Sequence, residues 1–66
     1  MQITLNGQQL PITENFSVAS LVDQRELNPK QIAIEINCKI VPREDYEHVL
    51  LADGDNVELV TLAGGG

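Results

Sequence analysis

Apolar and polar residues alternate in two short runs at the start of the chain, residues 1–5 and 8–12. Alternation with a period of two is typical of β-strands that bury one face. Asn6-Gly7 separates the two runs, and this pair favours a tight hairpin because both residues tolerate a positive φ angle. Because Pro11 has no N–H to donate to a neighbouring strand, we expect the second strand at the edge of the sheet.

A short helix is predicted after this hairpin. Ser17 is a typical N-cap residue, and Val18, Leu21 and Val22 follow it at the i, i+3, i+4 spacing of one helical face. A residue that precedes proline avoids the α region, so the helix should end before Asn28-Pro29.

Three further strands are predicted in the second half of the chain, again from alternation of apolar and polar residues. Pro42 should end the second of them, because proline cannot continue a hydrogen-bonded ladder. The predicted elements are, in order, a strand at 32–36, a turn at 37–39, a short strand at 40–41, a helical turn within 43–49, a turn at 53–55 and a strand at 56–62.

The predicted order of elements is therefore β-β-α-β-β-β, in which one crossing helix covers one face of a mixed sheet. This is a two-layer α+β architecture for a single domain over residues 1–62. Because a helical crossover lets two strands run in the same direction, we expect the first and last strands to pair in parallel. In the last strand, Val60 and Leu62 would face away from the helix, where they form a candidate docking patch.

Composition and charge narrow the classes of function. The 66 residues carry a formal net charge of −6, and the four basic residues do not cluster, which argues against binding to nucleic acid or to an anionic membrane surface. Cys38 is the only cysteine, so no internal disulfide can form. There is no leader-like segment and no apolar run near the roughly 18 residues of a membrane span, so the cytoplasm is the expected location.

The sequence ends in Ala63-Gly64-Gly65-Gly66, which predicts a flexible glycine-rich tail over residues 63–66. Because glycine has no Cβ, Gly64 and Gly65 can thread into a narrow active site of a partner protein, and four extended residues reach roughly 13 Å. The group delivered is the α-carboxylate of Gly66, which is ionised at neutral pH and must be activated before a nucleophile attacks it. We therefore expect a carrier that is not itself an enzyme and binds no cofactor.

Three other features of the sequence could carry chemistry, and we interpret each of them as structural. Cys38 lies in a predicted turn without a second cysteine or a histidine at useful spacing, and His48 lacks a carboxylate or serine partner. Asp53 and Asp55 flank a glycine but lack the remaining ligands of a calcium loop. We therefore expect no catalytic residue and no metal site.

Several segments, spread over the whole chain, resemble a known family. They are Met1–Gly7, Ile34–Asn37, Ile40–Glu44, Asp53–Asp55 and Gly65-Gly66. Together they resemble the ThiS-type sulfur carriers of thiamine biosynthesis, which have the ubiquitin-like β-grasp fold. The terminal Gly-Gly is common to ubiquitin-like carriers and modifiers, whereas the Val-Pro-Arg-Glu and Asp-Gly-Asp segments are more specific to this family.

The resemblance implies a cycle in which other proteins act on Gly66. A ThiF-type, E1-like enzyme would use ATP and Mg to adenylate its carboxylate, and sulfur from a cysteine desulfurase system would convert it to a thiocarboxylate. A ThiG-type thiazole synthase would then take the sulfur for the thiazole ring. Three alternatives stay open: a ubiquitin-like modifier that forms isopeptide conjugates, the small subunit of molybdopterin synthase, and a binding module with an inert tail.

Overall fold

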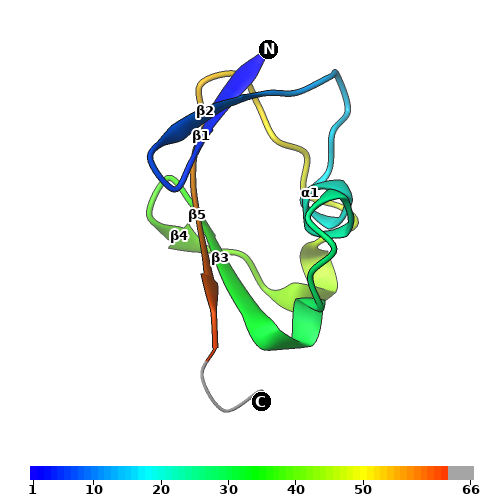
Figure 1. Ribbon diagram of the computed structural model, residues 1–66. Coiled ribbons are helices and arrows are strands. Elements are labelled where there is room, and N and C mark those ends of the chain that lie inside the picture. The colour runs from blue at the N-terminus through cyan, green and yellow to red at the C-terminus, as the bar shows by residue number, and fades with distance from the viewer. Residues whose placement is uncertain (63–66) are drawn as a thin grey trace.

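The computed structural model describes residues 1–62 and begins with a β-hairpin (Figure 1). Strand β1, Gln2–Leu5, pairs antiparallel with strand β2, Gln8–Pro11. Between the strands, Asn6 and Gly7 take φ angles of 49° and 83°, the positive values that a two-residue hairpin turn of this kind requires. The predicted hairpin is therefore confirmed.

The strands form one mixed sheet in the order β2-β1-β5-β3-β4. The last strand, β5 (Asn56–Thr61), lies in the middle, parallel to β1 and antiparallel to β3 (Ile32–Ile36). The short strand β4 (Lys39–Ile40) pairs with β3 at the far edge. The predicted parallel pairing of the first and last strands is confirmed, and Pro11 lies on an edge strand as expected.

Helix α1 (Val18–Gln24) crosses one face of the sheet (Figure 1). Ser17 caps its first turn as predicted, because its Oγ accepts a hydrogen bond from the Ser20 N–H at 3.0 Å. The helix ends before the next proline, where the 3-10 helix η1 (Pro29–Gln31) begins. A second 3-10 helix, η2 (Arg43–Asp45), is the predicted helical turn between β4 and β5. Within the described residues, no helix is long and apolar enough to cross a lipid bilayer.

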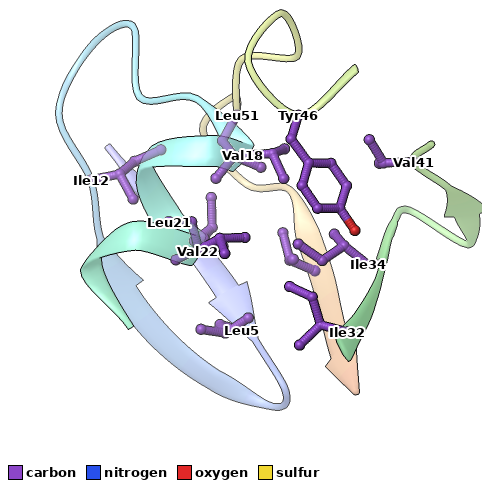
Figure 2. Packing of buried hydrophobic residues seen from close by; sticks show 12 residues of the cluster. Leu5, Ile12, Val18, Leu21, Val22, Ile32, Ile34, Val41, Tyr46 and Leu51 are labelled. Atoms are coloured by element: carbon purple, nitrogen blue, oxygen red, sulfur yellow. The ribbon is translucent and has the colours of Figure 1, made fainter. Parts of the chain in front are cut away.

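The hydrophobic core lies between α1 and the inner face of the sheet (Figure 2). Burying one large aliphatic side chain completely stabilises a fold by about 1.5–3 kcal/mol. Apart from Met1, which is 47% exposed, the positions that strand alternation and helical spacing assigned to the inner face are buried or partly buried, which agrees with the two-layer α+β architecture. The largest completely buried side chains are Ile3, Val18, Leu21, Ile34 and Val57.

The bounds of β4 differ from the prediction at both ends. β4 begins at Lys39 and not at residue 40, because the turn before it has two residues and not three. Asn37 and Cys38 form this turn with φ angles of 52° and 71°, so both of its residues are left-handed, as in the first hairpin. Val41 lies outside the strand, although its N–H still donates to the Ile34 carbonyl at 2.9 Å.

Candidate functional site

The described chain ends beside the start of β3. The last strand stops at Thr61, one residue earlier than predicted, because Thr61 pairs with Ile32 and no strand residue of β3 remains to oppose Leu62. The Leu62 N–H still donates to the Gln31 carbonyl at 2.8 Å. The predicted tail, with Gly64, Gly65 and the acceptor Gly66, lies outside the described residues.

Asparagines from the two hairpin turns hold β5 in place. The Asn6 side chain donates from Nδ2 to the Leu59 carbonyl at 3.0 Å and accepts from the Leu59 N–H through Oδ1 at 2.8 Å. Asn37 Oδ1 accepts from the Asn56 N–H at 3.0 Å, and the Asn37 N–H donates to the Asn56 carbonyl at 2.8 Å. Strands β1 and β5 are paired at Thr4–Asn56 and Leu5–Val57. The Asn6 side chain extends this contact to Leu59, and the Asn37 side chain adds an attachment at the start of β5.

The two aspartates around Gly54 are occupied by structural hydrogen bonds. Asp53 Oδ1 accepts from the Gln2 N–H at 2.7 Å, which ties the turn to the start of β1. Asp55 Oδ2 accepts from the Ala52 N–H at 2.8 Å, and its Oδ1 accepts from Asn37 Nδ2 at 3.0 Å. Among residues 1–62, no group of three or more His, Cys, Asp or Glu side chains is arranged to hold a metal ion.

The face of the sheet that points away from α1 carries the predicted docking patch. Val60 and Leu62 are 54% and 45% exposed on this face. The strand register adds two apolar residues that the sequence analysis missed. Ala33 on β3 lies opposite Val60. Ile40 on β4 is 66% exposed and lies opposite Glu35, which is two residues after Ala33 on β3 and points to the same face. Their outward position follows from alternation, but the residues that they lie opposite depend on which strands pair. A docking role for Val60 and Leu62 stays a prediction.

Two carboxylates lie next to these apolar residues. Glu35 on β3 is directly opposite Glu58 on β5, and Ile40 on β4 is directly opposite Glu35 on its other side. Directly opposed residues have Cβ atoms about 4.5–5.5 Å apart, and like charges at this separation destabilise a sheet. We use the name open face for the part of this outward surface that is made by Ala33, Glu35, Ile40, Glu58, Val60 and Leu62.

A separate hollow of about 410 Å³ lies on the helix side of the molecule. Ala19 and Val22 line it from α1, and Arg43 and Tyr46 line it from the region of η2. Burial raises the pKa of the Tyr46 phenol above its ordinary value of 10.0, and the Arg43 guanidinium opposes that rise. The hollow also has Asp23, Glu44 and Glu47 on its walls, so its lining combines one cation with three carboxylates and is negatively charged on balance.

Cys38 and His48 are both exposed. Cys38 carries a free thiol in the turn between β3 and β4. His48 follows η2, where its backbone N–H donates to the Asp45 carbonyl at 2.9 Å. Neither residue belongs to the open face.

Comparison with known proteins identifies the family. The model of the ThiS family matches residues 3–66. The sulfur carrier protein ThiS of Escherichia coli K12 is 33% identical over 66 residues, which is 100% of each chain. A thiazole synthase of Paramagnetospirillum magneticum is 32% identical over 66 residues, and this chain spans only 20% of that longer protein.

The solved structures agree with these sequence relationships. The crystal structure of the thiamine biosynthesis protein ThiS from Geobacter metallireducens superimposes with a TM-score of 0.81 at 26% identity and covers 100% of both chains. The mixed sheet with its crossing helix is therefore the ubiquitin-like β-grasp fold that the sequence predicted. The chain belongs to the ThiS family, the family of the Escherichia coli sulfur carrier protein.

Proposed function

We propose that this chain is a sulfur carrier of thiamine biosynthesis in which the carboxylate of Gly66 is adenylated and then converted to a thiocarboxylate. The thiocarboxylate donates its sulfur for formation of the thiazole ring. In this role the chain is a carrier, while the ATP, the magnesium ion and the catalytic groups belong to partner enzymes. We further propose that it works in the cytoplasm, where the exposed Cys38 thiol stays reduced.

The observation that carries this proposal is the family match, which extends to residue 66. The geometry of the described residues agrees with it. β5 is the central strand, side chains from both hairpin turns bind its backbone, and the sequence 63–66 follows directly. A rigid body followed by residues no larger than alanine is suited to presenting a terminal carboxylate inside another protein's active site.

The proposed chemistry has two steps at one carbon atom. First, a carboxylate oxygen of Gly66 attacks the α-phosphorus of ATP, which forms an acyl-adenylate and releases pyrophosphate. Sulfide, which a thiol reductant releases from the persulfide of a cysteine desulfurase, then attacks the carbonyl carbon and displaces AMP, so that sulfur is bonded to that carbon. No residue of this chain takes part in either step except Gly66.

Two enzymes would act on the carrier in this cycle. A ThiF-type adenylating enzyme activates Gly66, and a ThiG-type thiazole synthase receives the sulfur. The second partner is supported by the Paramagnetospirillum magneticum thiazole synthase, which contains a segment similar to all 66 residues of this chain within one longer polypeptide. A carrier-like segment joined to a protein of that name is consistent with close cooperation between the two.

Intact mass spectrometry tests the proposed function. The chain is incubated with the ThiF-type enzyme, a cysteine desulfurase, cysteine, a thiol reductant, ATP and magnesium. We expect the mass change for replacement of one oxygen by sulfur, and fragmentation should locate it at Gly66. A variant that lacks Gly66 is the control and should keep its mass; an unchanged mass for the wild-type chain would contradict the proposal.

The same measurement in the native host separates the alternatives. A ladder of conjugates with other proteins would indicate a ubiquitin-like modifier.

Growth of a strain whose only copy lacks Gly66 separates the two sulfur pathways: we expect a requirement for thiazole. Normal growth without thiazole, together with loss of molybdopterin, would instead indicate the small subunit of molybdopterin synthase.

A further inference from the structure

The open face places a pair of carboxylates within an apolar surface. Ile40, Val60 and Leu62 are 66%, 54% and 45% exposed, and all three lie on this one face, where gathered apolar side chains are typical of an interaction site. Glu35 and Glu58 lie in the same face, one on each of two paired strands. No other element of residues 1–62 covers this face, because α1 lies on the opposite side of the sheet (Figure 1).

The row of side chains across the sheet contains no positive charge to balance this pair. Glu35 is flanked by Ile40 on β4 and by Glu58 on β5. On the other side of Glu58, the nearby Asn6 side chain is engaged with the Leu59 backbone. Lys39 is opposite Ile36 and therefore belongs to the other face of the sheet by strand alternation. Within this row, therefore, the two carboxylates lie opposite each other and no neighbouring side chain supplies a balancing cation.

This arrangement is unfavourable for the isolated chain and favourable for one kind of complex. A guanidinium or ammonium group placed between the two carboxylates would attract both, and it would remove their mutual repulsion. Apolar side chains around that cation would bury Ile40, Val60 and Leu62 in the same contact. A basic residue with an apolar surround is a common centre for protein interfaces, where arginine is enriched.

We propose that Glu35 and Glu58 together bind one basic side chain of the enzyme that adenylates Gly66, and that they thereby select this partner at the open face. The inference rests on the proposed function for the identity of the partner. Charge complementarity argues for this occupant: the chain has a net charge of −6 and its pair of opposed glutamates is central in the face. Leu62 belongs to the open face and is four residues before Gly66, so docking here brings the reacting residue to the same protein.

Titration calorimetry between the full chain and the ThiF-type enzyme, without ATP, tests the pair. We expect E35Q and E58Q each to raise the dissociation constant about tenfold at low salt. The salt dependence of binding should become shallower in both variants, because each removes one charge from the interface. Melting temperatures should stay equal or rise, since each substitution also removes the repulsion.

Glu47 provides the matched control, because it is exposed and lines the hollow on the helix side. E47Q removes the same charge from the chain and should leave the dissociation constant within about twofold of the wild-type value. Wild-type affinity in both E35Q and E58Q would overturn the inference, and so would an equal loss in E47Q, which would indicate net charge alone. Failure of the wild-type chain to bind the enzyme would overturn it as well.

The proposed function is judged separately by the mass of Gly66. A wild-type chain that acquires sulfur while E35Q and E58Q bind normally would leave the function intact and remove this inference. A wild-type chain that acquires no sulfur would remove the function, whatever the variants do. At saturating enzyme, E35Q and E58Q should still acquire sulfur, because neither residue touches the reacting carboxylate.

Discussion

Asn6 binds both backbone groups of Leu59 with its side-chain amide, at 3.0 Å to the carbonyl and 2.8 Å from the N–H. The side chain thereby takes the place that a further residue of β1 would have in the sheet. Asn6 itself has a φ of 49° because it begins the hairpin turn, so its backbone can no longer follow the strand direction. One residue thus turns the chain and lengthens the contact between β1 and the central strand.

Replacement of Asn6 should destabilise the fold through both of these roles. We expect N6G to lower the free energy of unfolding by about 1–3 kcal/mol, because it keeps the turn and loses two hydrogen bonds. N6A should cost about 1 kcal/mol more, since alanine is strained at a positive φ. Urea unfolding measures both values. The control is N15G, because Asn15 also has a positive φ, 60°, in an exposed turn; an equal loss in N15G would contradict a special role for Asn6.

Leu62 should contribute to binding and hardly at all to stability. We expect L62D to weaken binding to the adenylating enzyme at least about tenfold, because burying a leucine side chain is worth about 1.5–3 kcal/mol. The melting temperature should change little, since the side chain is 45% exposed and lies outside β5. L50D is the control: Leu50 is 53% exposed and bridges to Ser17 beside the helix, away from the open face. Unchanged affinity in L62D would remove the docking role.

Tyr46 should make the stability of the fold fall at alkaline pH. Its pKa is raised by burial, so the folded chain holds the phenol proton more tightly than the unfolded chain does. This contribution is fully present below the unfolded value near 10 and is lost as pH rises through the raised folded pKa. Tyrosinate absorbance reports on Tyr46 alone, because it is the only tyrosine.

Two variants check the cause of this pH dependence. In R43Q the pKa of Tyr46 should rise further, because the guanidinium that opposes the effect of burial is removed. In Y46F the alkaline loss of unfolding free energy should be smaller than in the wild-type chain. A Tyr46 titration at or below the ordinary value would contradict the effect of burial.

Cys38 should be replaceable with a gain in stability. It has a φ of 71° at the second position of its turn, where glycine fits without strain. Left-handed backbone costs a non-glycine residue about 1–2 kcal/mol, but glycine loses more conformational entropy on folding, which offsets part of the gain. We therefore expect C38G to raise the free energy of unfolding by about 0.5–1 kcal/mol. Sulfur loading of Gly66 should stay normal, and its loss in C38G would instead give the thiol a role in transfer.

Much of this protein is determined by local sequence. Asn6-Gly7 specifies a hairpin because few residues accept two consecutive positive φ angles, and Ser17 specifies a helix start because its hydroxyl satisfies a free backbone N–H. The buried positions follow from alternation and helical spacing. The glycines at 64–66 and the resemblance to the ThiS family also required no structure.

The composition of the open face was decided by the tertiary structure. Alternation alone places Glu35 and Glu58 on outward surfaces of two strands that lie far apart in the sequence. They become neighbours because burial of the core selects one register between β3 and β5, and a shift by one residue would turn each buried side chain of β5 to the solvent. The same long-range packing brings Ile40 beside Glu35 and sets Asn6 against Leu59. Contacts of this kind depend on the whole core at once, and no local pattern along the chain contains them.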